Sequence, residues 1–299
     1  WLVYLMLTVL EILALIIAGM QPFDAVCNAF STMAAGGFSP HARSILGYSS
    51  PLITWIVSFF MLLAGANFAL QYRVFLRRQP RALINSEEFR IYLMIIAGFS
   101  LALAIDLFRN GYGSLSSCFR DGIFQILSIL TTTGFSSADF SGWILSAQAL
   151  LFGMMLIGGC AGSAGGGIKV VRIMFIFKYL RREIRQIIHP SAVLPIKVDR
   201  TTIEGDIQRQ MLSFVLIYLV LMVCSGIIVT IIEHDATIGF VGTAATLGNV
   251  GPGFGEIGPM GNFSSLCALS KTIFILDMLV GRLELIPFLV MLNPEFWRY

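Results

Sequence analysis

The sequence predicts an all-helical integral membrane protein in which repeated units of helix, short re-entrant helix and helix surround a central pore. The first observation is composition: 57% of the 299 residues are hydrophobic and 12% are charged, about half the charged share of a soluble domain. The second is that apolar residues come in runs of about twenty, the length that crosses a bilayer core of roughly 30 Å. The third is a glycine cluster that recurs between these runs.

Six apolar runs are long enough to span a membrane. Between the first and second, third and fourth, and fifth and sixth runs lie shorter semi-apolar segments, each ending in glycines. These three segments are too short to cross, so each is expected to enter the membrane and return to the same side. The six runs cover about residues 1–19, 51–72, 89–108, 143–178, 211–232 and 264–292.

Basic residues predict the orientation of the chain. They concentrate in the connections at 73–90 and 172–209, whereas the other connections carry only Arg43, Arg109 and Arg120. Cytoplasmic connections carry the excess of Lys and Arg. We therefore expect the two basic connections and residues 1 and 299 on the cytoplasmic side, with the three glycine-bearing segments facing outside.

The three glycine-bearing segments look like copies of one another. They cover residues 23–41, 120–140 and 236–255. The first two share a Gly-Phe-Ser motif, preceded in both by an aspartate thirteen residues before the glycine. When the third is aligned at the same point, the key glycines are 97 and 117 residues apart. Self-similarity of this kind indicates a repeated unit.

Such a unit is suited to handling ions. A chain that turns back inside the membrane exposes backbone polar groups, which is tolerated only where they are buried in protein or line a water-filled cavity. Glycine permits the turn without side-chain obstruction, and rings of carbonyl oxygens can replace the hydration shell of a cation. One such segment would favour an ordinary external loop, but three in register favour a pore.

A second glycine cluster, GGCAGSAGGGIK at 158–169, interrupts the fourth apolar run. Glycine costs about 1 kcal/mol per residue in a helix relative to alanine, so we expect a loop at membrane depth, although close helix packing is an alternative. A phosphate-binding loop is excluded because Ile168 separates Gly167 from Lys169. A serine hydrolase at Ser163 is disfavoured, because the GxSxG motif is incomplete and the histidines lie elsewhere.

Arg282 lies inside the last apolar run, where an ionised side chain costs roughly 2.5–3.5 kcal/mol unless it faces a cavity or a partner. We expect it to face the pore below the filter and to repel cations there. Asp277 or Glu284 is the expected partner, and a purely structural ion pair is the alternative. Lys169 is a similar candidate, although its long side chain can also reach toward the cytoplasm.

These motifs together resemble the Trk/Ktr/HKT superfamily of potassium transport proteins, over essentially the whole chain. In that superfamily four M1-P-M2 units (helix, pore helix with filter, helix) surround one pore, and the motifs here resemble the second, third and fourth units, at 1–80, 81–209 and 210–299. By position, the resemblance implies a filter of Ala35, Gly36, Gly37, Thr132, Thr133, Gly134, Asn249, Val250 and Gly251. It implies a gate that includes Gly162, Gly165, Gly166, Gly167, Lys169 and Arg282.

The resemblance also implies a function. The expected activity is gated translocation of K⁺ across the bacterial inner membrane, with no enzymatic chemistry, no cofactor and no nucleic-acid partner. The expected partners are the lipid bilayer, a second copy in a homodimer and a cytoplasmic nucleotide-binding regulatory ring. The first filter segment lacks threonines and the third has Pro252 in place of phenylalanine, so weaker discrimination against Na⁺ is expected. An ion-coupled secondary transporter, linked to Na⁺ or H⁺, is the alternative.

Three units cannot close a ring that four units close in the superfamily. The remaining first unit is expected to precede Trp1, with roughly a hundred or more residues at the observed repeat spacing. A unit that starts and ends in the cytoplasm would deliver the chain to residue 1 on the predicted side. The chain expressed without that unit is expected not to conduct selectively.

Overall fold

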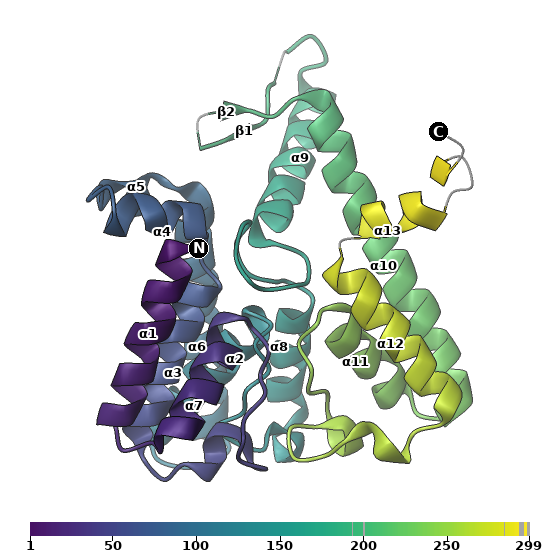
Figure 1. Cartoon of the computed structure of the whole chain (residues 1–299). Helices are drawn as coiled ribbons and strands as arrows, with labels where there is room; N and C mark the ends of the chain where they lie inside the picture. Colours follow the sequence, from purple (N-terminus) through teal and green to yellow (C-terminus); the bar gives the residue numbers. More distant parts are fainter. Residues whose placement is uncertain (193, 200, 284, 293–295, 298–299) are drawn as a thin grey trace.

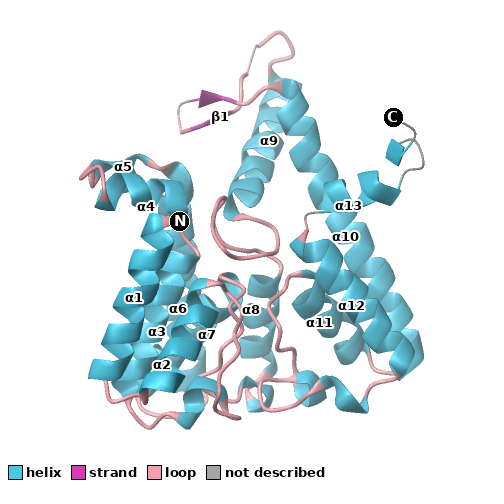
Figure 2. Cartoon of the chain, viewed as in Figure 1, coloured by secondary structure: helices cyan, strands magenta, loops and turns pink. Residues whose placement is uncertain are grey.

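The computed structural model describes residues 1–192, 194–199, 201–283, 285–292 and 296–297. The all-helical prediction is confirmed, because the only strands in this part of the chain are two short ones. Strands β1 (Lys197–Val198) and β2 (Thr201–Thr202) pair antiparallel in the connection after α9, with Lys197 opposite Thr202. Figure 2 shows how little of the molecule is strand.

The helices follow the predicted order of long helix, short helix and long helix three times. The first set is α1 (Leu2–Ile17), α2 (Pro22–Met33), α3 (Pro51–Ala64), α4 (Phe68–Phe75) and α5 (Arg81–Asn85). The second is α6 (Glu87–Arg109), α7 (Leu115–Leu130), α8 (Leu145–Met155) and α9 (Val170–Ile188). The third is α10 (Gly205–Glu233), α11 (Ala236–Leu247), α12 (Ala268–Arg282) and α13 (Leu285–Leu292). Single-turn 3₁₀ helices occur at Ser44–Gly47, Phe140–Gly142, Gly255–Ile257 and Phe263–Ser265.

Side-chain caps explain where several helices begin. Ser86 accepts a hydrogen bond from the backbone N–H of Phe89 at the start of α6, and Ser114 does the same for α7. Asp235 accepts two N–H groups at the start of α11. Each cap satisfies backbone donors that have no partner within the helix. Proline at the first helical position of α2 and α3 is tolerated because that position needs no N–H donor.

The six apolar runs do not form six continuous helices: the break in the fourth run was predicted, whereas the breaks in the second and the last were not. Among the described residues, α6 and α10 are single helices long and apolar enough to cross a membrane, and α3 with α4 qualifies only as a pair bent by 104°. The break at 65–67 places α4 across the direction of α3, because Asn67 caps a new helix through the N–H groups of Ala69 and Leu70. The fourth predicted span is split into α8 and α9, and the last into α12 and α13.

The short helices α2, α7 and α11 lie inside the three sets. Helix α7 is packed between α3, α6 and α8, and the largest core cluster includes its Phe124 and Leu130. Its polar Gln125 and Ser128 are fully buried as well. Polar side chains on a buried helix are expected where they and the backbone groups are buried in protein or line a polar cavity.

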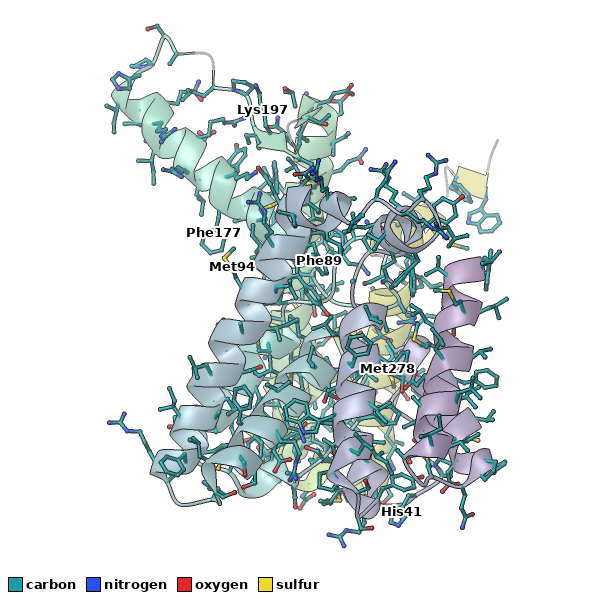
Figure 3. All side chains as sticks on the ribbon, turned by 90° about the vertical axis from the view of Figure 1, so that its left-hand side faces the viewer. His41, Phe89, Met94, Phe177, Lys197 and Met278 are labelled. Carbon is teal, nitrogen blue, oxygen red and sulfur yellow. The ribbon has the colours of Figure 1, made fainter. Side chains whose placement is uncertain are left out.

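The two kinds of connection lie at opposite ends of the molecule. His41, in the first glycine-bearing segment, is at one end, and Lys197, in the second basic connection, is at the other (Figure 3). Figure 1 places α5, β1 and β2 toward the same end of the molecule as the start of α1. This arrangement separates the basic connections from the segments that follow the short helices α2, α7 and α11.

Candidate functional site: three filter turns above a glycine loop

The three short helices end in the same backbone turn. A C-cap in the right-handed helical region, at Ala34, Thr131 and Gly248, is followed in each by a residue of positive φ. That residue is Ala35 (53°), Thr132 (56°) and Asn249 (56°). Two positions later a glycine again has positive φ, namely Gly37 (71°), Gly134 (85°) and Gly251 (102°).

Hydrogen bonds at these turns repeat as well. In the first, the N–H of Ala35 donates to the carbonyl of Thr32 at 3.1 Å and the N–H of Gly36 donates to that of Ser31 at 2.8 Å. The pattern is a Schellman motif, which satisfies the last carbonyls of a helix. The second turn has Thr132 on Ile129 and Thr133 on Ser128, and the third has Asn249 on Thr246 and Val250 on Ala245. We call residues 35–37, 132–134 and 249–251 the filter turns.

Neighbouring filter turns are in direct contact. A Cβ atom on Gly37 would lie 2.1 Å from the carbonyl oxygen of Thr133, and a Cβ atom on Gly134 would lie 2.2 Å from that of Val250. Both positions therefore require glycine, on account of space and of positive φ. The structure thus brings the three turns that carry the predicted filter residues together, the first against the second and the second against the third, in a row that we call the arc. A Cβ atom on Gly251 would meet no atom within 4 Å.

The walls of the arc are chemically unequal, as the sequence predicts. The second turn carries hydroxyl groups, with Oγ1 of Thr131 and Thr133 2.8 Å apart. The first turn carries an alanine and two glycines, and the third carries Asn249, whose side-chain amide donates to the carbonyl of Met278 at 3.3 Å. Phe135 after the second turn is buried, whereas Phe38 after the first is 82% exposed.

The two aspartates that lie thirteen residues before Gly37 and Gly134 each form a tether outside the turns. Asp24 accepts a hydrogen bond from the hydroxyl of Tyr48 at 3.0 Å, and Asp121 accepts one from Ser137 at 3.3 Å. Each joins its short helix to the chain that leads away from the filter turn. Burial, reinforced by the Asp24 carboxylate, raises the pKa of the Tyr48 phenol, so the Asp24 tether keeps its proton at neutral pH.

The glycine cluster forms the predicted loop. Residues 156–169, here called the glycine loop, contain no helix and join α8 to α9. Figure 1 shows this loop between α9 and the level of α8. The close helix packing that was the alternative is therefore excluded, because the glycines do not lie on a helix.

The glycine loop docks onto the other broken helix. The N–H of Cys160 donates to the carbonyl of Gly65 at 2.8 Å, and the N–H of Phe68 donates to the carbonyl of Gly162 at 3.1 Å. Two interrupted helices thus satisfy each other's free backbone groups. This is the arrangement required of irregular backbone away from water. The break at 65–67 was not predicted, although Gly65 and the helix-capping Asn67 are sequence signals for it.

The glycine loop also touches two filter turns. The N–H of Gly166 donates to Oγ1 of Thr132 at 2.7 Å. A Cβ atom on Gly165 would lie 2.7 Å from the carbonyl of Thr131, and one on Gly166 would lie 2.8 Å from the carbonyl of Gly248. The loop is therefore packed directly against the helix ends from which the filter turns emerge.

The two candidate basic residues lie at this same level. Lys169 caps α9 and its ammonium group donates to the carbonyl of Gly165, so it folds back on the glycine loop and does not reach away from it. Arg282 donates to the carbonyl of Ala34, at the end of α2, at 3.4 Å. A cation at a helix C-terminus complements the helix dipole.

The expected ion pair between Arg282 and Asp277 is wrong. Asp277 is buried and accepts a hydrogen bond from Ser225 at 2.9 Å, which joins α12 to α10. The two residues are five positions apart, so they point to different faces of the helix. The other expected partner, Glu284, lies outside the described residues.

No group of three or more His, Cys, Asp or Glu side chains in the described part of the chain is arranged to hold a metal ion. The oxygens available for a cation at the filter turns are backbone carbonyls and threonine hydroxyls. Such neutral oxygens are the ligands by which a filter replaces the hydration shell of an alkali cation.

Comparison with known proteins matches the whole chain. The family model TrkH, described as a cation transport protein, matches residues 1–299. The Trk system potassium uptake protein TrkH of Escherichia coli K12 is 37% identical over 301 residues, and TrkI of Halomonas elongata is 34% identical over 298 residues. The alignments cover 100% and 99% of this chain, but 62% and 60% of the relatives.

A solved structure gives the same result. The potassium transporter TrkH from Vibrio parahaemolyticus superimposes with a TM-score of 0.93 at 36% identity, covering 99% of this chain and 64% of that one. The chain therefore spans somewhat less than two thirds of the length of these relatives.

Proposed function

Because the chain belongs to the TrkH family of cation transport proteins, we propose that it supplies three units of a gated pore for K⁺. The observation that carries this proposal is the repeated filter turn. Three short helices end in the same Schellman motif and the same pair of positive-φ positions, and their turns touch one another. Ordinary external loops have no reason to share one backbone conformation and to converge.

In this proposal the cation is held by the filter turns. Carbonyl and hydroxyl oxygens of the nine filter residues replace its water shell, and the C-terminal ends of α2, α7 and α11 add negative dipole character. The unequal walls of the arc support weaker discrimination between K⁺ and Na⁺ than an identical ring would give. K⁺ is the transported ion, and no bound cofactor or enzymatic step is needed.

We propose that the glycine loop is the gate. Gly162, Gly165, Gly166 and Gly167 belong to a loop that lies against the filter turns, and Lys169 and Arg282 place positive charge at the same level. Glycine-rich backbone can rearrange with little steric cost. A shift of the loop would open the path below the filter, and its present position would obstruct that path.

The proposed orientation, membrane, units and partners rest on the family to which the chain belongs. The filter turns face outside, the connections at 73–90 and 172–209 face the cytoplasm, and the protein lies in the bacterial inner membrane. The units at 1–80, 81–209 and 210–299 join a further unit that closes the arc beside Gly251. A homodimer and a cytoplasmic nucleotide-binding ring are the proposed protein partners, the bilayer is the proposed environment, and no nucleic acid is involved.

Two other functions are distinguishable. An ion-coupled secondary transporter also uses broken helices, and it would move K⁺ in fixed proportion to Na⁺ or H⁺. A hydrolase would use Ser163, but within the described residues its buried hydroxyl has no hydrogen-bond partner that would serve as a base. Ser163→Ala would abolish a hydrolase and is expected to leave ion flux near normal.

The decisive experiment is flux from the full-length protein that contains this chain, reconstituted in liposomes. K⁺ and Na⁺ gradients are imposed separately, and the flux of each ion is recorded with and without a gradient of the other ion or of H⁺. We expect passive K⁺ flux that needs no second gradient. A K⁺ flux that stops without a Na⁺ or H⁺ gradient would favour the secondary transporter instead.

A further inference from the structure

A carboxylate outside the glycine loop contacts both the loop and the helix that follows it. Glu88, in the first turn of α6, is 8% exposed, and its Oε1 accepts a hydrogen bond from the backbone N–H of Ala161 at 2.6 Å. The same carboxylate faces the backbone N–H of Val171, in the first turn of α9. One side chain thus joins Ala161, within the glycine loop, to the helix that follows the loop.

We infer that Glu88 is a positioning residue that holds the glycine loop in its obstructing position. The inference rests on the proposed gating function of the loop, and it adds the group that sets the position of the gate. Glu88 does not touch the conducted ion in this account. It acts through the backbone of Ala161 and Val171.

Glu88 is expected to hold the glycine loop more strongly than Thr132, the other side chain that accepts a hydrogen bond from the loop backbone. Among the described residues, two side chains outside the loop accept hydrogen bonds from its backbone: the hydroxyl of Thr132 and the carboxylate of Glu88. Hydrogen bonds to an ionised acceptor are roughly twice as strong as neutral ones. A carboxylate at the N-terminus of α9 is also favoured by the helix dipole, and Lys169 is close enough to interact with it electrostatically.

Removal of the carboxylate would leave the partly buried backbone N–H groups of Ala161 and Val171 without this acceptor. The cost of an unsatisfied buried donor is greater than the gain from the original bond. The loop would therefore shift until water or another acceptor reached these groups. A shift of this kind moves Gly165 and Gly166 away from the filter turns.

Glu87 provides a matched control on the same helical turn. It forms an ion pair with Lys178, and its own N–H donates to Asp199 at 2.6 Å. These contacts join the start of α6 to Lys178 on α9 and to Asp199 in the connection after α9, and they do not involve the glycine loop. Glu87→Gln and Glu88→Gln remove the same charge from the same turn, whereas Glu87→Ala and Glu88→Ala also remove the acceptor.

The first measurement is K⁺ and Na⁺ flux from the full-length protein in liposomes. Glu88→Ala is expected to raise basal K⁺ flux about tenfold, the factor that one charge-assisted hydrogen bond is worth, with an unchanged K⁺/Na⁺ ratio. Glu88→Gln retains an acceptor oxygen for Ala161, so its flux is expected to lie nearer to wild type than that of Glu88→Ala. Both Glu87 variants are expected to conduct as wild type does.

The second measurement follows the loop itself and does not depend on conduction. Cys160, within the glycine loop, is a free thiol that is 1% exposed. With the other cysteines replaced, a membrane-impermeant maleimide should label Cys160 at least tenfold faster in Glu88→Ala than in wild type or in the Glu87 variants. The reagent is applied to detergent-solubilised protein that elutes as a single folded species.

The two measurements separate the inference from the proposed function. Faster labelling of Cys160 with unaltered flux would support the positioning role of Glu88 and overturn the loop as a gate. Unchanged labelling in Glu88→Ala would overturn the positioning role, whatever the flux. Equal effects of the Glu87 and Glu88 variants would also overturn it, because loss of charge at the start of α6 would then be sufficient.

Discussion

The backbone N–H of Gly166 donates a hydrogen bond to Oγ1 of Thr132 at 2.7 Å, which fastens the glycine loop directly to a filter turn. Thr132 is one of the residues with positive φ at the end of α7. Its side chain therefore binds the glycine loop, while its backbone forms part of the second filter turn. In the proposed function, this single bond connects the gate to the filter.

Thr132→Val tests the bond without changing shape. Valine keeps the β-branch, and so the backbone strain of threonine at positive φ, but it offers no acceptor to Gly166. We expect basal K⁺ flux to rise about fivefold, corresponding to about 1 kcal/mol for a neutral hydrogen bond. Thr132→Ser keeps the acceptor and should conduct as wild type does. Equal flux from the valine and serine variants would disprove the role of the bond.

Gly134→Ser tests the filter turns. The backbone at this position has a positive φ of 85°, and a Cβ atom would lie 2.2 Å from the carbonyl oxygen of Val250. A serine here would therefore force the second and third filter turns apart. We expect the K⁺/Na⁺ permeability ratio to fall severalfold with little change in expression. Gly142→Ser is the control, because a Cβ atom there meets no atom within 4 Å. If Gly134→Ser retains the wild-type ratio, Gly134 does not belong to the filter.

The filter turns could be predicted because their signals are local. A glycine at a fixed place after a short apolar helix is dictated by positive φ and by close approach, and three copies made the pattern visible. The loop at 156–169 could be predicted for the same reason, since several glycines in ten residues make a helix unstable. Both features depend on backbone properties that the residue type alone determines.

The contacts that hold these turns and loops in place could not be predicted in the same way. The break at 65–67 is stabilised by the glycine loop almost a hundred positions later, and Glu88 contacts Ala161 across a similar separation. Neither pairing leaves a periodic signal in the sequence. The contact of Arg282 with Ala34 also joins distant positions, and Asp277, one of the two expected partners of Arg282, points to a different face of the helix.

Gly165→Ala and Gly166→Ala test the loop as a gate. Their Cβ atoms would lie 2.7 and 2.8 Å from carbonyl oxygens of Thr131 and Gly248, so the loop must move away from the helix ends. We expect a severalfold change in K⁺ flux and no change in the K⁺/Na⁺ ratio, measured in the same liposomes. Gly153→Ala on α8 is the control, since its Cβ atom would meet nothing within 4 Å. A loop that tolerated both substitutions with normal flux would not be the gate.

Arg282→Ala tests the positive charge below the first filter turn. The guanidinium group donates to the carbonyl of Ala34 at 3.4 Å, so it stands at the end of α2, where an approaching cation would pass. Removal of one charge lowers the electrostatic barrier by about 1 kcal/mol or more at a partly screened site, and we expect basal K⁺ flux to rise at least fivefold.

Arg282→Lys keeps the charge and should retain low basal flux, although its ammonium cannot reproduce the planar guanidinium contact. Arg209→Ala removes an equal charge from an exposed pair with Asp206, remote from the filter turns, and should leave flux unaltered. If Arg282→Ala and Arg209→Ala conduct alike, the charge of Arg282 does not act on the conduction path, and its contact with Ala34 serves only to hold α12 against α2.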